Sequence, residues 1–431
     1  MSQKKWGTFV VVPLGLAVLV SAVAPRAAAQ GSRLLVSTET DAVSAGGKDG
    51  PFREEDVLFL GDGPSAFVTA QNWRVLVGDG DGDGHFDDEP SEVDALAVVP
   101  GSPARPSAFD LLVSFSADRT FASGEKARDG DVVRFVPGGS FQVVHSEDVF
   151  AAGTATSAID VDAFAIAPDG TLFFSFAEDE TTSAGYLAAE NGGNPTLDEA
   201  CVFTWRPGEA EAHLFLTPDA LVAMVNQALG SALTTVGDLQ GLDLDPENPG
   251  ALLFAVSSKS RGAEGTVFST AGGGSVASLG GRALAGETMG FGEPESLDSL
   301  AVVAEQKTPL SVRADATEVS VSASAFVELS IAHGSPGGEA VLLVAPAVLP
   351  APTPVPMPRL GGSGRIYLDM ASPLFKASLR NPKFRTRLDG SGCGAVRFPT
   401  AGSPAGIVRL VQAVDLSGRE ASEAVAIETL P

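Results

Sequence analysis

A short pattern of acidic and apolar positions recurs along the first three hundred residues. In each copy an aspartate or glutamine at the third position precedes a short run. In that run small or polar side chains alternate with apolar ones, which indicates a short and mostly buried strand. The four copies are Glu92–Val98, Asp160–Ile166, Asp238–Leu244 and Ser296–Val302. A tandem repeat decides the fold of a chain, so the positions between the copies become informative.

Three further strands are predicted after each of the first three copies. Strong turn residues such as Pro168-Asp169-Gly170 separate the first two strands, and glycine-rich turns separate the last two. The predicted second, third and fourth strands are Leu111–Phe115, Asp131–Phe135 and Phe141–Val144, then Leu172–Phe176, Cys201–Trp205 and His213–Leu216, then Leu252–Val256, Thr266–Ser269 and Val276–Leu279. Four antiparallel strands repeated in tandem are the unit of a β-propeller blade.

The two ends of the repeat region complement each other. Leu34–Ser37, Asp56–Leu60 and Ala66–Thr69 match strands two to four, with no first strand before them. Leu297–Val302 matches a first strand with nothing behind it, so we expect it to complete the first blade and protect its edge. Residues 30–306 are therefore predicted to form a strand-closed propeller of about four blades, or five if one is degenerate. The alternative is a β-sandwich or an irregular all-β array.

The last part of the chain, residues 307–431, lacks the repeat but still alternates as strands do. Glu318–Ser322 and Phe326–Ile331 are typical of half-buried strands. Further strands are predicted at Ala340–Val344, Arg365–Leu368, Ala395–Phe398, Ile407–Ala413 and Ala424–Ile427. The proline-rich run Ala345–Pro358 predicts an extended surface segment, because proline cannot continue a strand ladder. We predict a small antiparallel β-sandwich that is immunoglobulin-like in its strand count.

Three short motifs in this last part carry a resemblance. They are Ser372-Pro373-Leu374-Phe375, Leu388-Asp389-Gly390 and the closing residues 424–431. With them, the chain resembles uncharacterised exported proteins of planctomycete-type bacteria, which combine a signal peptide, a propeller-like front and a β-sandwich tail. The resemblance implies export and this architecture, and it supplies no activity and no catalytic residue.

The first residues predict export. Lys4 and Lys5 precede the apolar stretch Phe9–Val23, and Ala27-Ala28-Ala29 forms a small-residue cleavage site. This order predicts a signal peptide over residues 1–29, cut before Gln30, with an uncleaved anchor as the alternative. No later stretch has the length of a membrane span. We therefore expect an extracytoplasmic protein, periplasmic or secreted.

The charge and the cysteines narrow the classes of partner. A formal net charge of −26 argues against nucleic acid or an anionic membrane as the partner and favours cation binding. The two cysteines, Cys201 and Cys393, lie far apart in the chain, so they are either two separate thiols or one disulfide.

One loop has the spacing of a calcium site. Alternating aspartate and glycine let a chain curl until several carboxylates converge on a hard ion that prefers oxygen ligands. Carboxylates stand at positions 1, 3, 5 and 9 of the loop and glycine at position 6: Asp79, Asp81, Asp83, Asp87 and Gly84. Pro90 stands where an EF-hand has its bidentate glutamate, so Glu89 or Glu92 would have to substitute. The alternative is a solvated acidic turn without an ion.

A second candidate site follows from the repeat. Asp94, Asp162 and Asp298 occupy one repeat position, and Gln240 occupies it in the remaining copy. First strands line the channel of a propeller, so these carboxylates are predicted to meet near its axis, where they would hold a cation or raise each other's pKa. The alternative is that each aspartate caps the start of its strand by accepting hydrogen bonds from nearby amides.

No sequence motif of a known catalytic class is present: the chain lacks G-x-S-x-G, H-E-x-x-H, C-x-x-C and P-loop patterns. The long predicted loops all fall at the same end of the blades, where loops on a rigid scaffold usually carry function. The leading hypothesis is a non-enzymatic exported binding or scaffold protein, with Ca²⁺ as its candidate stabilising ion and a protein or glycan as its ligand. The alternative is a calcium-dependent hydrolase or lactonase that uses Asp94, Asp162 and Asp298.

Overall fold

The computed structural model is built mainly from short strands, which confirms the prediction of an all-β chain. It describes most residues between 33 and 430. The gaps of six residues or more are 1–32, 43–51, 74–92, 101–107, 304–309, 348–354, 357–364 and 400–406, and the other gaps are shorter.

Four sheets of four antiparallel strands account for the repeat region. The first has the order β22-β1-β2-β3, and the second has the order β4-β5-β8-β9. Their strands are β22 (Leu297–Val303), β1 (Arg33–Thr38), β2 (Val57–Leu60) and β3 (Pro64–Val68), then β4 (Ala95–Val98), β5 (Leu111–Ser114), β8 (Val132–Val136) and β9 (Ser140–His145). The late strand β22 pairs along the whole of β1, as its sequence predicts.

The third and fourth sheets follow the same plan, with the orders β10-β11-β14-β15 and β16-β17-β18-β19. Their strands are β10 (Val161–Ile166), β11 (Leu172–Phe176), β14 (Val202–Trp205) and β15 (His213–Leu216), then β16 (Gly241–Leu244), β17 (Leu252–Ala255), β18 (Phe268–Ser269) and β19 (Ser275–Val276). The predicted last strand of the fourth sheet is split, because Ser278–Leu279 (β20) leaves the sheet and pairs with Arg282–Ala283 (β21).

Turn chemistry explains where the strands reverse. Between β10 and β11 the amide of Gly170 donates a hydrogen bond to the carbonyl oxygen of Ala167, and the carboxylate of Asp169 accepts one from the amide of Thr171. Gly170 has a φ of 85°, a left-handed conformation that glycine adopts without steric cost. The sequence Pro-Asp-Gly therefore fixes the hairpin at this point.

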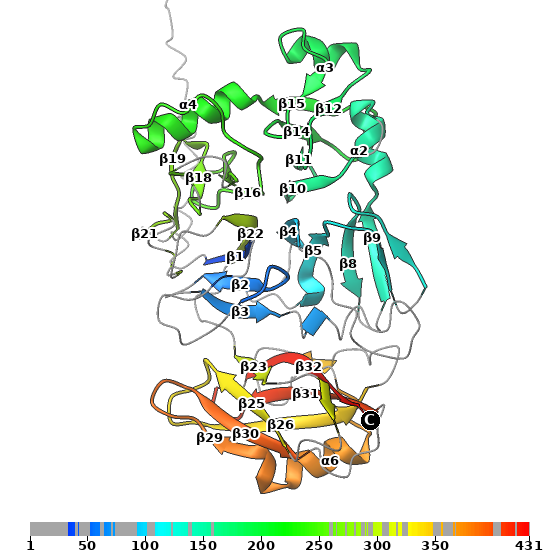
Figure 1. Ribbon diagram of the computed structural model, residues 1–431, viewed down its shortest axis with the longest axis vertical. Helices are drawn as coiled ribbons and strands as arrows, with labels where there is room; N and C mark the ends of the chain where they lie inside the picture. The colour runs from blue at the N-terminus through cyan, green and yellow to red at the C-terminus, as the bar shows by residue number, and fades with distance from the viewer. Residues whose placement is uncertain are drawn as a thin grey trace, which may run out of the picture.

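Each of the four sheets packs on two others. Strand β4 contacts both β10 and β22, and β16 contacts the same two strands. Figure 1 shows these four strands near the middle of the upper part of the molecule, with β3, β9, β15 and β19 further out. Four separate hydrophobic clusters fill the spaces between the first and second, second and third, third and fourth, and fourth and first sheets. No described sheet closes on itself, so side-chain packing and hydrogen bonds between sheets, and not one continuous ladder, join the four sheets.

The longer connections carry small elements of their own. The connection between β5 and β8 contains a hairpin, and the corresponding one between β11 and β14 contains a helix between two short strands. These elements are η1 (Ala108–Asp110), β6 (Arg119–Thr120), β7 (Lys126–Ala127), α2 (Glu147–Thr154), β12 (Glu180–Thr181), α3 (Gly185–Glu190), β13 (Thr196–Leu197) and α4 (Pro218–Leu229).

The last part of the chain folds into two stacked sheets, one of three strands and one of five. The first has the order β23-β25-β30, and the second has the order β24-β32-β31-β26-β29. Their strands are β23 (Ser311–Ala314), β25 (Phe326–Ala332), β30 (Gly394–Pro399), β24 (Glu318–Ser320), β32 (Glu420–Leu430), β31 (Ile407–Asp415), β26 (Glu339–Pro346) and β29 (Arg385–Arg387). Strand β24 pairs with β32 in parallel, so the expectation of a purely antiparallel sandwich is wrong at this edge.

A helix that the sequence pattern did not indicate covers the second face of the five-stranded sheet. The two sheets share one hydrophobic cluster, and α6 (Pro373–Arg380) closes another on the far side through Phe375. Ser372 caps this helix, and η3 (Pro382–Phe384) follows it. Two short strands, β27 (Val355–Pro356) and β28 (Arg365–Ile366), pair with each other, and β28 contacts β32. The prediction of an extended surface segment from Ala345 is wrong at its start, because Ala345 is buried within β26.

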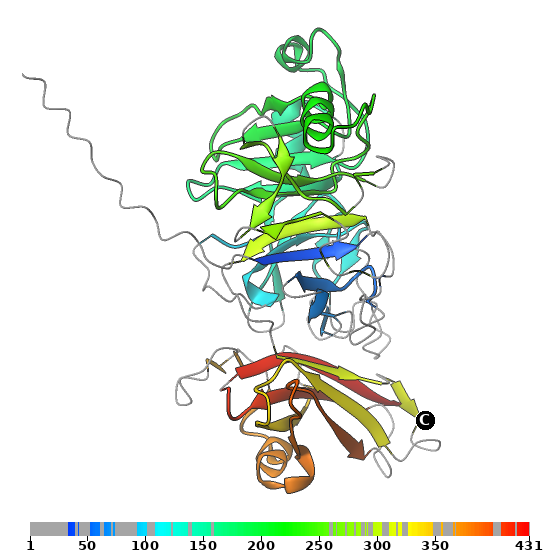
Figure 2. The ribbon, with the colours of Figure 1, turned by 90° about the vertical axis from the view of Figure 1, so that its left-hand side faces the viewer.

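Among the described residues, the two groups of sheets meet at a buried contact around Ala424. The side-chain amide of Asn72 donates a hydrogen bond of 2.5 Å to the carbonyl oxygen of Ala424 on β32. Ala424 packs in the same hydrophobic cluster as Trp73 and Phe67. Figure 2 shows the two groups one above the other along the long axis of the molecule. Among the described residues, no helix combines the length and apolar character of a membrane span.

Candidate metal centre

Three strands bring aspartates to one point between the sheets. Asp94 directly precedes β4, and Asp162 and Asp298 are the second residues of β10 and β22. Each strand is the first of its sheet in the repeat, and it is the strand that contacts neighbouring sheets. The shared repeat position in the sequence therefore becomes a shared position in space.

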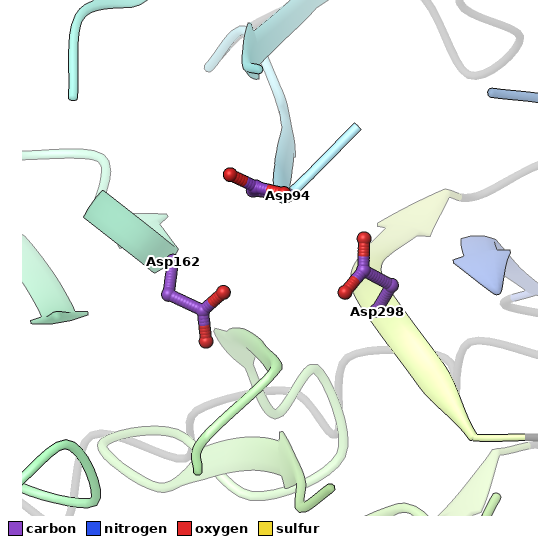
Figure 3. A group of neighbouring side chains, drawn as sticks. All are labelled: Asp94, Asp162 and Asp298. Atoms are coloured by element: carbon purple, nitrogen blue, oxygen red, sulfur yellow. The ribbon is translucent and has the colours of Figure 1, made fainter. Parts of the chain in front are cut away.

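The three carboxylates face one another. One oxygen from each lies within 4.8 Å of the corresponding oxygens of the other two. Figure 3 shows the three side chains pointing inward from separate strands towards a common space. They are buried, with exposed fractions of 6% for Asp94, 6% for Asp162 and 4% for Asp298. Three negative charges at such short range repel strongly unless a proton or a cation compensates them.

Burial raises the pKa of Asp162 well above its ordinary value, and the charges of Asp238, Asp298 and Asp94 raise it further. A hydrogen bond with the carboxyl group of Asp238 acts in the same direction. The Oδ2 atom of Asp162 is buried and has no hydrogen-bond partner among the described residues. A buried oxygen left in this state costs free energy, so an unfilled acceptor at this position points to a ligand.

Asp162 does not cap its strand in the way that other aspartates of this chain cap turns. Asp131 accepts hydrogen bonds from the amides of Arg128 and Glu147. Asp245 accepts them from the amides of Glu247 and Asn248. No described amide donates to Asp162, and its hydrogen bond joins it to another carboxyl group. For this residue the geometry favours an ion site over a strand cap.

Gln240 and Asp238 complete the surroundings in different ways. Gln240 is buried directly before β16, as the repeat predicts, but its Oε1 atom accepts a hydrogen bond of 3.0 Å from Ser296 Oγ. Asp238 was missed by the sequence reasoning, because it lies two residues before the position that aligns with the other aspartates. The sequence feature that could have indicated it is its place as the first residue of the copy Asp238–Leu244, the weakest of the four. The fourth sheet thus supplies a carboxylate from a displaced position.

A second raised pKa lies close by. Burial raises the pKa of Asp160 to about 7, and the charges of Asp129, Glu147 and Glu178 add to the effect. Asp160 is only partly buried. Asp160 therefore belongs to a second acidic group, although it lies only two residues from Asp162 in the chain.

The predicted calcium loop cannot be compared with this geometry. Asp79, Asp81, Asp83 and Asp87 lie outside the described residues. Their role stays a prediction from the sequence.

Chemically, the three-aspartate cluster offers hard oxygen ligands alone. Oxygens bound to one Ca²⁺ at 2.3–2.6 Å can be at most about 5 Å apart, and the carboxylate oxygens meet this limit. Neither histidine nor cysteine belongs to the cluster, so its donor set suits Ca²⁺ better than softer ions. No model of a known protein family matches the chain, and no curated protein is similar to it in sequence. The geometry of the cluster is therefore the basis for interpreting the protein.

Proposed function

We propose that this chain is an exported binding or scaffold protein, stabilised by Ca²⁺, that holds a protein or glycan ligand on the loop-bearing end of a four-bladed propeller. The observation that carries the proposal is the meeting of Asp94, Asp162 and Asp298 from three different sheets. An ion at this point would join three sheets that no continuous strand ladder connects.

The arrangement of the sheets supports the propeller interpretation. Four sheets of equal strand number each pack on two neighbours, and their first strands meet. In this interpretation β22 seals the ring by completing the first sheet, which joins the two ends of residues 30–306. Residues 307–431 then form a separate sandwich domain that orients or attaches the propeller.

The position of the cluster links the ion to the loops. The aspartates stand where the first strands of three sheets begin, and the connections that lead into first strands include α2 before β10 and α4 before β16. In an antiparallel sheet the connections between second and third strands start at this same end. An ion here would hold the base of the longest connections in place, and such loops are the usual location of binding residues.

Calorimetric titration and thermal unfolding with Ca²⁺ test the proposal. We expect Ca²⁺ to bind the mature chain and to raise its melting temperature, because an ion that binds only the folded state stabilises it. Asp162→Asn should remove this increase. In the presence of a chelator the same variant should melt at or above the temperature of the parent, because it carries one buried negative charge fewer.

Asp169→Asn is the matched control, since Asp169 lies in an exposed turn. It should respond to Ca²⁺ as the parent does. A double variant, Asp81→Ala with Asp83→Ala, separates ions bound at the predicted loop from the ion at the three aspartates. If Asp162→Asn binds Ca²⁺ with the heat and the thermal shift of the parent, the proposal is wrong.

A hydrolase or lactonase is the second candidate, and the pKa of Asp162 favours it. A buried carboxyl group whose pKa is raised by burial and by neighbouring carboxylates resembles the general acid of many acid–base pairs. Assays of phosphate esters, lactones and glycans with added Ca²⁺ decide between the two classes. Turnover that Asp162→Asn abolishes would establish the enzyme, whereas Ca²⁺ binding without turnover favours the binding protein.

Export is proposed from the signal-peptide pattern and from the resemblance to exported bacterial proteins. Mass spectrometry of the protein secreted or released by a bacterial host measures the mature N-terminus. We expect it to begin at Gln30. A chain that keeps residues 1–29 would contradict cleavage and favour the uncleaved anchor.

A further inference from the structure

The charge of this protein is strongly segregated along the chain. Residues 30–306 contain 13 Lys and Arg against 44 Asp and Glu, a formal charge of −31. Residues 307–431 contain 12 Lys and Arg against 10 Asp and Glu, a formal charge of +2. The net charge of −26 therefore describes the four-sheet region and conceals a part of opposite character. A charge asymmetry of this kind is informative about partners.

Five basic residues and no acidic residue fall within positions 376–387. They are carried by α6, η3 and β29, and all five are exposed: Lys376, Arg380, Lys383, Arg385 and Arg387. We call this set the basic surface. Figures 1 and 2 both show α6 at the end of the molecule opposite to α3 and α4. The positive charge is therefore concentrated at one tip of a long molecule.

Most of this charge is not used inside the fold. Arg385 forms an ion pair of 3.0 Å with Glu339, and Lys376 donates to the carbonyl oxygen of Ala371. No ion pair connects Arg380, Lys383 or Arg387 to any other residue that the structure describes. These three exposed cations are free to meet an anionic partner.

A cavity of about 370 Å³ lies beside the basic surface. One side is the turn Gly337–Glu339 and the other is β29, with Ser417 nearby. The ion pair of Arg385 with Glu339 lines the cavity, Arg387 adds a cation without an ion-pair partner among the described residues, and Thr386 and Ser417 bring hydroxyl groups. A guanidinium beside hydroxyls and a glycine turn matches the chemistry of an acidic sugar, whose carboxylate pairs with arginine while its hydroxyl groups exchange hydrogen bonds.

The acidic region is far enough away not to cancel this attraction. Ala424 on β32 contacts the four-sheet region, whereas α6 packs on β26, two strands further along the same sheet. Two strand spacings are about 10 Å, which exceeds the Debye length of about 8 Å at physiological salt. A polyanion that approaches this tip is therefore attracted by the basic surface. The same polyanion repels the acidic four-sheet region, which then points away from it.

From these observations we propose that the basic surface and its cavity bind a carboxylate-bearing polysaccharide, and that binding leaves the four-sheet region pointing away from the polymer. A repeating polymer fits better than a lipid bilayer, because Met370 and Leu379 are the large apolar side chains exposed there, too few to form an apolar patch. The inference is independent of the Ca²⁺ site and assigns the sandwich domain a ligand of its own.

The test is the binding of polygalacturonate to the mature chain at low salt, with neutral dextran as the polymer control. We expect binding to polygalacturonate alone and a steep loss of affinity as the salt concentration rises. The variant Arg380→Gln, Lys383→Gln, Arg387→Gln should bind at least about tenfold more weakly, because each exposed cation contributes to the electrostatic attraction.

A matched variant changes the net charge equally at exposed residues elsewhere: Lys126→Gln, Arg206→Gln, Arg397→Gln. It should bind polygalacturonate as the parent does, and thermal unfolding checks that both triple variants are folded. Absence of binding by the parent, or equal loss in the two variants, overturns the proposal. Binding to anionic phosphatidylglycerol vesicles without binding to the polymer, or salt-sensitive self-association in its place, would also overturn it, since either identifies a different partner.

Discussion

The hydroxyl oxygens of Ser37 and Ser299 lie 2.7 Å apart across the strand pair β1–β22, although 262 residues separate them in the chain. Both serines are fully buried. The amide of Ser37 also donates to Ser299 Oγ, and Ser37 Oγ donates to the carbonyl oxygen of Val93, next to the aspartate cluster. This polar contact fixes the register where the last strand of the repeat meets the first.

Ser299→Ala should destabilise the protein by about 1–3 kcal/mol, because it leaves the buried amide of Ser37 without an acceptor. Urea unfolding measures the loss. Ser183→Ala provides the control, because its hydrogen bond is exposed and should be worth far less. If the two variants lose the same free energy of unfolding, the buried contact between Ser37 and Ser299 does not stabilise the pairing of β1 and β22 more than an exposed hydrogen bond would.

Gly130→Ala should be among the most damaging single substitutions. A Cβ atom at this position would lie 1.8 Å from the carbonyl oxygen of Ile159 and 2.9 Å from the Cβ atom of Glu147. Both neighbours are firmly held, so we expect a loss of about 3 kcal/mol or more in the free energy of unfolding. Gly185→Ala is the control, because no atom lies within 4 Å and α3 begins there. That change should be neutral or slightly stabilising, since alanine favours helix over glycine.

The two cysteines should differ in reactivity. Cys201 is fully buried, and burial raises the pKa of its thiol to about 12, so it forms almost no thiolate near neutral pH. Cys393 is partly exposed. A thiol reagent at pH 8 should label one cysteine per native chain and two after unfolding in guanidinium. Cys393→Ser should leave the native protein unlabelled, and rapid labelling of that variant would contradict the burial of Cys201.

Asp243 should make stability depend on pH. Its carboxylate bridges sheets by accepting hydrogen bonds from the amides of Val302 and Leu244, yet burial raises its pKa to about 7 from the ordinary 3.8. The folded state then binds a proton more tightly than the unfolded state. Its contribution is therefore full below about pH 4 and is lost as the pH rises towards 7.

The measurement is thermal unfolding of the parent and Asp243→Asn at pH 5 and pH 8, both with a chelator. We expect the melting temperature of the parent, relative to that of the variant, to fall from pH 5 to pH 8. Only the parent loses the contribution of protonated Asp243. Other buried carboxylates titrate equally in both proteins and cancel in the comparison. If the melting temperature of the parent relative to the variant stays constant or rises from pH 5 to pH 8, Asp243 does not have the raised pKa.

The strands of the four sheets could be predicted because their local signals agree. Alternating side chains mark each strand, and residues such as Gly170 fix the turns. The meeting of Asp94, Asp162 and Asp298 was also predictable, since equal positions in a repeat become equivalent positions in space. Asp238 was missed because the fourth copy places its carboxylate two residues earlier, and only the folded backbone shows that it reaches Asp162.

The C-terminal sheets show what the sequence pattern leaves open. Ser372 and Pro373 are sound helix-start signals, but α6 has only eight residues, too few for a clear periodic pattern. The parallel pairing of β24 with β32 joins segments about a hundred residues apart, and such pairing depends on tertiary packing, not on local composition. The basic surface was likewise hidden, because a net charge of −26 averages two regions of opposite character.

The first sheet cannot be finished until residue 303 has been synthesised, because β22 supplies its last strand to β1. While the second, third and fourth sheets are being synthesised, the edge of β1 at Leu34, Leu35 and Val36 lacks the hydrogen-bond partners that β22 later supplies. A strand edge in that state is a template for pairing with another chain. The interval between the emergence of β1 and the arrival of β22 is therefore the period when aggregation competes most directly with folding, and a holding chaperone would protect the nascent chain then.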